Sequence, residues 1–297
     1  MNSKMIIFII FLGAGINLYS MTGFEFLKIE TDAGIISRGG GIVENNFITA
    51  VSYNPALLGD IERAQIGFSY SRWFMDTSHT FAGIGMEGGR NYRFGISVIK
   101  FDGGEIEERD ENGIKKGNYR NYDQSINLNF GVKGENYIAG VGVKYIESNI
   151  SDIRAGGFGF DFGIVERLSV LPLDIGLSVL NAGRRIKYIE KREKLPTTLR
   201  LSFGVRAMSV FRIVGDVNYD VYNKTNEIRI GSEYGIGLSK VGSLYLRGGI
   251  YNLENIKEFG NFGGGVGFRA RNINFDVGMI NNRDLGNVTR ITLNTFF

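Results

Sequence analysis

The chain has 297 residues, and its 34 lysines and arginines against 31 aspartates and glutamates leave a formal net charge of +3. This balance argues against a nucleic-acid-binding protein, which normally presents a strongly basic face, and the absence of cysteine excludes disulfides, thiolate metal sites and cysteine nucleophiles. Three prolines are too few for a proline-rich linker between domains.

Residues 1–20 differ in composition from the rest of the chain. They hold one lysine, then an apolar run from Met5 to Leu12, then small and polar residues. This order is typical of a secretory signal peptide, with cleavage expected after Ser20. A single membrane anchor is the alternative, but the apolar run is shorter than the ~20 residues that a spanning helix needs.

Residues 21–61 are glycine-rich and polar, with an Asn-Pro turn and only short apolar stretches. Backbone of this kind cannot lie in lipid, because its N–H and C=O groups would have no partners there. If the rest of the chain forms a membrane barrel, we predict that these residues lie inside its lumen as a hatch. A tail in the periplasm is the alternative.

Residues 62–297 alternate between apolar and polar or small side chains. In "LRLSFGVRA" (199–207), Leu199, Leu201 and Phe203 alternate with Arg200 and Ser202, which indicates a β-strand with two unlike faces. Breaks in the alternation predict fourteen antiparallel strands near 62–74, 77–88, 90–101, 122–134, 136–149, 154–167, 172–182, 195–207, 209–222, 226–238, 243–252, 259–270, 272–281 and 288–297.

The length of these strands and their connections favour an all-β membrane barrel. Tilted strands that cross a bilayer need about 9–11 residues, which many of the predicted strands reach. Short connections, such as 134–135 and 271–272, fall at one end of the sheet, and long ones fall at the other, at 102–121, 183–194, 253–258 and 282–287. A soluble β-sandwich, which would bury the apolar faces against a second sheet, is the alternative.

Aromatic residues near the predicted strand ends fit the girdles that membrane barrels place at their two interfaces. These residues are Trp73, Phe74, Tyr92, Phe101, Tyr122, Tyr137, Tyr219, Tyr222, Tyr251 and Phe259.

In such a barrel the polar faces would line the lumen. Their charged members are Arg200, Arg206, Asp216, Glu233, Arg247, Asp276 and Arg290. These charges would either pair with one another and with a plug, or form the selectivity ring of an open porin. The sequence leaves both open.

Three motifs in the sequence contain residue types that can carry chemistry. His79, the only histidine, lies near Asp76 and Ser78, but neighbours in a loop point in different directions, so we expect an exposed loop histidine and no catalytic triad. "GIGMEG", with Gly83, Gly85 and Gly88, has no following helix to hold a phosphate, so these glycines are expected to make room for neighbouring side chains.

The third motif, "EERDENG" with Glu108, Asp110, Asn112 and Gly113, is similar to the front of a calcium loop. Tyr119 stands where such a loop needs its bidentate glutamate, so we expect a solvated acidic loop. No enzyme activity and no cofactor are expected.

The order of these segments resembles the PorV/PorQ group within the fatty-acid transporter (FadL) superfamily of outer-membrane barrels. The stretches that carry the resemblance are "FLKIETDAGIISRGGG", "AVSYNPALLGDIERAQIGFSYSRWFMD", "GLSVLNAGRRIKYIEKREKLPTTLRLSFGVRA" and the aromatic C-terminal residue, Phe297. The resemblance covers essentially all of the chain after residue 20. The short external loops depart from the family's pattern and put specific partner docking in doubt.

The resemblance implies a fourteen-stranded outer-membrane barrel, formed by 62–297, with residues 21–61 as a hatch in which Asn54, Pro55 and Ala56 form the family's Asn-Pro-Ala turn. It implies transport of a hydrophobic small molecule across the outer membrane. The alternatives are a PorV-like component that docks secreted proteins without a path through the barrel, and a general porin. The expected partners are outer-membrane lipid and either a hydrophobic small molecule or a secreted protein, and no nucleic acid.

Overall fold

A computed structural model describes residues 22–41, 47–168, 170–253, 262–282 and 286–297. The expected signal peptide, 1–20, lies outside these residues. No helix in the described part of the chain is long and apolar enough to cross a membrane.

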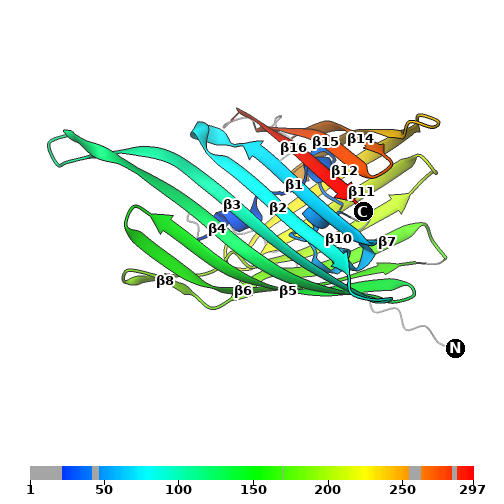
Figure 1. The fold of residues 1–297 in the computed structure, drawn as a ribbon, viewed down its shortest axis with the longest axis horizontal. Coiled ribbons are helices and arrows are strands. Elements are labelled where there is room, and N and C mark those ends of the chain that lie inside the picture. Colours follow the sequence, from blue (N-terminus) through cyan, green and yellow to red (C-terminus); the bar gives the residue numbers. More distant parts are fainter. Residues whose placement is uncertain (1–21, 42–46, 169, 254–261, 283–285) are drawn as a thin grey trace.

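Within the described residues, fourteen antiparallel strands close into one barrel (Figure 1), which confirms the predicted fold class. Each barrel strand pairs with the barrel strands that precede and follow it in the chain, so that β7 pairs with β10, and β1 pairs with β16 to close the ring. The barrel strands are β1 (Ala64–Arg72), β2 (Ser78–Glu87), β3 (Tyr92–Arg109), β4 (Lys115–Lys133), β5 (Tyr137–Ile150), β6 (Ile153–Arg167), β7 (Leu173–Gly183), β10 (Thr198–Arg206), β11 (Phe211–Asp220), β12 (Thr225–Gly237), β13 (Ser243–Ile250), β14 (Phe262–Ala270), β15 (Ile273–Asn282) and β16 (Gly286–Phe296).

The alternating pattern of the sequence becomes the two faces of the wall, because successive strand side chains point to opposite sides. On β10, Leu199 is 42% exposed on the outer face, whereas Arg200 and Ser202 are buried on the inner face. On β16, Thr292 and Asn294 are buried between the exposed Ile291 and Leu293. The apolar side chains therefore form the outside of the barrel.

The long connections carry more structure than the sequence predicted. The predicted loop at 102–121 is mostly strand: β3 and β4 continue as a two-stranded hairpin that projects well beyond the barrel rim (Figure 1). The predicted loop at 183–194 holds a second hairpin of β8 (Ile186–Tyr188) and β9 (Lys191–Glu193). Most of 253–258 and half of 282–287 lie outside the described residues.

The aromatic residues do not all face outward as girdles would require. Tyr92 and Tyr137 are about half exposed on the outer wall. Tyr251 is buried in the lumen, where its hydroxyl donates to the carbonyl of Ile36 at 2.5 Å, and Phe101 packs against an apolar cluster inside the barrel. The prediction was wrong for these two, because nearness to a strand end does not fix the face on which a ring lies.

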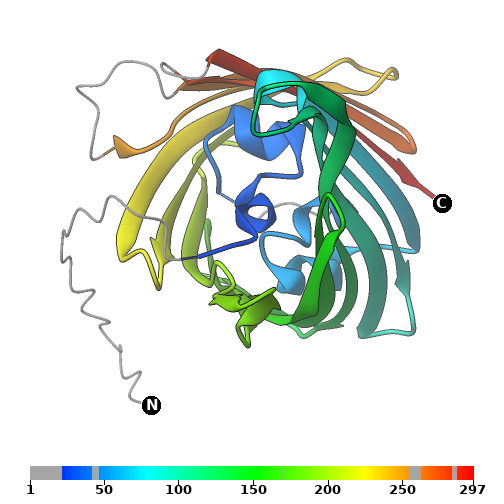
Figure 2. The ribbon, with the colours of Figure 1, turned by 90° about the vertical axis from the view of Figure 1, so that its left-hand side faces the viewer.

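The residues between 22 and 61 that the structure describes, 22–41 and 47–61, lie inside the barrel (Figure 2). We call them the N-terminal segment. Its elements are short: η1 (Glu25–Lys28), α1 (Ala33–Ser37), η2 (Ile48–Ala50) and η3 (Pro55–Asp60). Helix α1 packs on β13 to β16, η2 packs on β1 and β2, and η3 packs on β3 to β6. The remaining short element, η4 (Phe74–Asp76), connects β1 to β2.

Candidate functional site

The lumen has an apolar side along β2, β3, β5 and β6. There the N-terminal segment contributes Phe26, Ile48 and Leu58, which pack with wall residues such as Phe81 and Ile146. All five side chains are almost fully buried. This cluster is an apolar core inside the barrel.

The opposite side of the lumen is charged, and several of its charged side chains form buried ion pairs. Glu233 of β12 accepts from Arg247 of β13 at 2.6 Å and from Arg38 of the N-terminal segment at 3.2 Å. Arg247 also contacts Asp276 of β15 at 2.5 Å. These buried side chains satisfy one another, as charges taken out of water must, and they attach the N-terminal segment to the wall.

Most of the predicted lumen charges lie where the sequence placed them. Arg200, Asp216, Glu233, Asp276 and Arg290 are buried on the inner face, and the Arg247 side chain is 6% exposed. Arg206 differs, because it lies at the rim, with its side chain 40% exposed and paired with Asp174 at 2.8 Å.

The Asn-Pro-Ala turn at 54–56 begins η3 and lies against the wall. The Asn54 side chain accepts from the Ala56 N–H at 2.9 Å, which caps the helical turn. The same side chain donates to the carbonyl of Leu177 on β7 at 3.3 Å. A side chain on Gly140 would collide with the Pro55 carbonyl, and one on Gly163 would collide with the Asn54 amide, so glycine is required at both seats.

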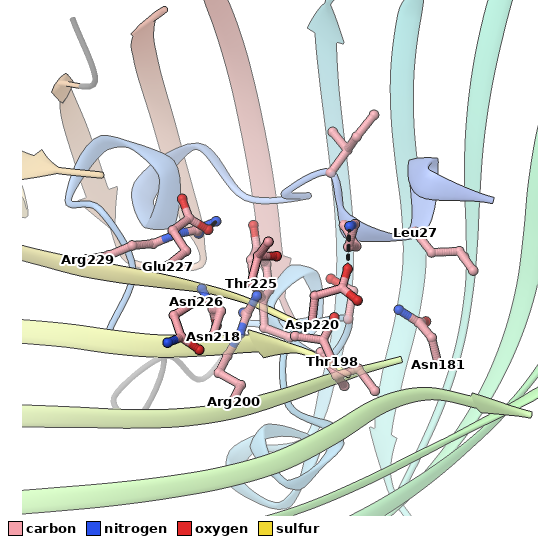
Figure 3. Close-up of a pocket in the computed structure, with 15 residues that line it drawn as sticks. Leu27, Asn181, Thr198, Arg200, Asn218, Asp220, Thr225, Asn226, Glu227 and Arg229 are labelled. Atoms are coloured by element: carbon pink, nitrogen blue, oxygen red, sulfur yellow. Dashed lines mark hydrogen bonds and ion pairs between the residues drawn. The ribbon is translucent and has the colours of Figure 1, made fainter. Parts of the chain in front are cut away.

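A cavity of about 180 Å³ lies between the N-terminal segment and β7, β10, β11 and β12 (Figure 3). Its lining includes Asn181 near the end of β7 and Thr198 at the start of β10, so it lies toward the end of the barrel that holds the long connection between these strands. Its apolar lining comes from Leu27, Ile29, Tyr53 and Leu180. The polar lining residues are Lys28, Ser52, Asn181, Thr198, Arg200, Asn218, Asp220, Thr225, Asn226, Glu227 and Arg229. At its rim, the side chain of Lys28 is 34% exposed, so the cavity reaches solvent at this end.

Most charges around the cavity already have partners. Lys28 contacts Asp220 at 2.9 Å and Glu25 at 2.5 Å. Arg229 pairs with Glu30 of the N-terminal segment and contacts Glu227 at 2.6 Å. Burial alone would raise the pKa of Glu30, but the nearby Arg229 and Arg200 lower that pKa below its ordinary value. Glu30 is therefore held as a carboxylate.

Arg200 and Asn218 are exceptions to this pairing. They lie opposite each other on β10 and β11, and both are more than nine-tenths buried. Among the described residues, the Arg200 Nε and Nη1 atoms and both polar atoms of the Asn218 amide lack a hydrogen-bond partner. Arg200 is among the lumen charges predicted from the sequence. Asn218 is not, although the alternation of β11 places it on the inner face.

The prediction of an exposed loop histidine at position 79 was wrong. His79 lies on β2, fully buried, with its Nδ1 atom 2.9 Å from the Arg290 guanidinium. The two residues meet because Ser71, opposite His79 on β1, is also opposite Arg290 on β16. Asp76 instead pairs with Arg72 at the rim, so no Ser-His-Asp arrangement forms here.

The two remaining motifs have structural explanations. A side chain on Gly85 would meet Ile61 and Ile48 of the N-terminal segment at 2.7 and 3.1 Å, so this glycine makes room for the lumen contents. In the acidic motif, the Asp110 carboxylate accepts from the N–H groups of Asn112 and Ile114, both at 2.9 Å, and shapes the hairpin turn. Within the described residues, no group of three or more metal-binding side chains occurs.

Comparison with known proteins gives likenesses of fold. No protein-family model and no curated protein matches the sequence. A FadL homologue of Pseudomonas aeruginosa superposes with a TM-score of 0.58 and 11% identity, covering 89% of this chain and 98% of its own.

Two further solved structures are similar to the chain. The Pseudomonas putida toluene transporter TodX gives a TM-score of 0.60 and 9% identity, covering 88% of this chain and 99% of its own. The CymD monoaromatic hydrocarbon channel gives a TM-score of 0.62 and 11% identity, covering 90% of this chain and 98% of its own. At these identities the comparison shows the shared barrel fold.

Proposed function

We propose that this chain is an outer-membrane channel that passes a small, largely hydrophobic molecule, with the N-terminal segment as its hatch. The barrel shares its fold with a toluene transporter and a monoaromatic hydrocarbon channel. Its apolar outer face suits acyl chains, and all of its described strands except β13 reach the ~9 residues that a bilayer requires. The expected signal peptide would export the chain to this location.

The observation that carries the proposal is that the cavity adjoins the apolar cluster inside the barrel. Leu27 and Ile29 line the cavity and also pack against that cluster. A molecule in the cavity would therefore have an apolar surface to move along once the N-terminal segment shifts. A cavity of about 180 Å³ is close to the ~150 Å³ of an engineered apolar cavity that binds benzene.

The test is uptake of labelled toluene by cells that express the chain in an intact outer membrane. Leu180→Trp would fill the cavity, since Leu180 lines it and is 5% exposed. Leu177→Trp is the matched control, because Leu177 lies on the same strand but is 53% exposed on the outer wall.

We expect uptake above that of cells without the chain, slowed by Leu180→Trp and unchanged by Leu177→Trp. Uptake equal to that of cells without the chain would rule out transport of this probe. Equal effects of the two tryptophans would rule out this cavity as the path.

A second candidate is a docking component for secreted proteins, without a path through the barrel. It is favoured by the lumen, which the N-terminal segment occupies, and by the β3–β4 hairpin, which projects beyond the rim. Photo-crosslinking from Ile114, 63% exposed near the hairpin turn, tests it: a specific secreted protein captured there, together with absent uptake, would favour docking.

An open general porin is disfavoured by the same packing, because inward side chains of the wall bond to the N-terminal segment. A steady open-channel current from the purified protein in a planar bilayer would favour the porin over the hatch-containing channel.

A further inference from the structure

Arg200 and Asn218 form the centre of one inward-facing row of side chains. Ser178 of β7, Arg200 of β10, Asn218 of β11 and Glu227 of β12 stand opposite one another across four adjacent strands. Ser178 is engaged, since its hydroxyl donates to the Tyr53 carbonyl at 3.0 Å, and Glu227 contacts Arg229. The two middle members keep unused hydrogen-bonding capacity.

Arg200 has no carboxylate within 4 Å among the described residues. Its guanidinium lies over the Tyr53 ring, 5.2 Å from the ring centroid, which positions the group without neutralising it. Asp216, one inward row deeper, faces Gly40 of the N-terminal segment and does not line the cavity. Glu30, whose pKa Arg200 lowers, forms its ion pair with Arg229 and not with Arg200. A buried guanidinium with two nitrogens that lack hydrogen-bond partners, beside an amide that also lacks them, is costly, so such a pair in a cavity wall indicates a ligand that supplies acceptors.

We propose that the cavity binds a small carboxylate whose body is no larger than one aromatic ring. A carboxylate presents two acceptor oxygens in the plane that a guanidinium fork matches, and the Asn218 amide can donate to it as well. Leu27, Ile29 and Leu180 would contact the apolar body. A volume of about 180 Å³ excludes a long acyl chain from this cavity.

This inference names the class of ligand. That the ligand is also the cargo rests on the transport function proposed above, whereas its binding does not.

The test measures binding of benzoate to the purified full-length chain in detergent by calorimetry. Benzamide and toluene serve as neutral probes of similar shape, and inorganic phosphate serves as an anion without an apolar body. We expect benzoate to bind at least about tenfold more tightly than the other three probes, as a charge-assisted contact predicts.

Arg200→Gln should weaken benzoate binding by about 10- to 100-fold. Arg206→Gln is the matched control, because it makes the same change on the same strand but lies at the rim, outside the cavity. Retained electrophoretic heat-modifiability shows that each variant is folded. Should Arg200→Gln fail to fold, Asn218→Asp, which places a negative charge in the same row, is expected to cause a similar loss.

Three results would overturn the inference: toluene or benzamide binding as tightly as benzoate, phosphate binding as tightly as benzoate, or equal losses in the Arg200 and Arg206 variants. The failures of the two proposals are distinguishable. If benzoate binds but toluene is not taken up, the carboxylate ligand is supported and the transport function is contradicted. If toluene is taken up but benzoate does not bind, the transport function is supported and the carboxylate ligand is contradicted.

Discussion

At the scale of single residues, the fit between the N-terminal segment and the wall depends on glycines. Gly140 and Gly163 lie under the Asn54–Pro55 turn, where any side chain would collide with the segment. Other wall glycines have open space, among them Gly248, whose added methyl would meet nothing within 4 Å. The two kinds of glycine look alike in the sequence.

Gly140→Ala is therefore expected to destabilise the protein by about 1–3 kcal/mol, because the added methyl group would collide with the Asn54–Pro55 turn and force it to shift. Gly248→Ala, the matched control, should be neutral within about 0.5 kcal/mol. Urea unfolding of the refolded protein in detergent measures both. Equal midpoints for the two variants would show that the turn does not lie on Gly140.

Glu30→Gln is expected to destabilise the protein by about 2 kcal/mol at neutral pH, because a charged hydrogen bond to Arg229 is lost. The pKa of Glu30 is lowered in the folded state. Its contribution is therefore fully present above the ordinary pKa of 4.5 and decreases as the pH falls toward the folded value.

The unfolding midpoint measured against pH should show this loss in the native chain and a shallower one in Glu30→Gln. Glu111→Gln, at the exposed hairpin turn, is the control and should follow the native curve. Identical acid profiles for the native chain and Glu30→Gln would contradict the assignment.

The inner face could be predicted from the sequence residue by residue, because alternation alone assigns Arg200, Glu233 and Arg290 to the lumen. Partners could not be predicted. The contact of His79 with Arg290 depends on the closing pair of β1 with β16, which joins positions 211 residues apart. The unpaired state of Asn218 depends on the register of three strands.

At the scale of elements, the β3–β4 hairpin shows where the sequence pattern gives no signal. From Glu105 to Arg120 the two strands pair only with each other, since the pairing of β3 with β2 stops at Asp102 and the pairing of β4 with β5 stops at Asn121. Both faces of this ribbon meet solvent, so no alternation marks it. Backbone pairing continues there without a buried face.

Replacing 105–120 by an Asn-Gly turn should leave the barrel's unfolding free energy unchanged within about 0.5 kcal/mol. Replacing 186–193 in the same way should cost about 2 kcal/mol or more, because Ile186, 3% exposed, packs in the apolar cluster. Denaturant titration of both variants checks this. A large loss in the first variant would mean that the ribbon supports the wall.

At the scale of the whole molecule, the barrel could be predicted because its main driving pattern is periodic and local. Fourteen segments repeat the same two-faced alternation, and each joins its sequence neighbour, so the topology follows from the order of the strands. The position of the N-terminal segment could not be predicted in the same way, because its helical turns are too short to show a repeating pattern of apolar residues.

If the outer face meets lipid, the location of an exposed apolar residue should decide the effect of a charge. Leu128, 59% exposed, lies on the part of β4 that forms the wall, and Ile114, 63% exposed, lies at the hairpin turn. Leu128→Arg should cost about 2–4 kcal/mol in a lipid bilayer, whereas Ile114→Arg should cost almost nothing. Equal, small effects in vesicle unfolding experiments would indicate that water meets both positions.

The position of the N-terminal segment also constrains the order of assembly. The segment directly precedes β1, yet it bonds to strands from the far end of the chain, for example through Ala33 to Thr292 and Arg38 to Glu233. The last seam, β1 against β16, closes around it. The beginning of the chain must therefore be in place before its two end strands meet, or else be threaded into a finished ring.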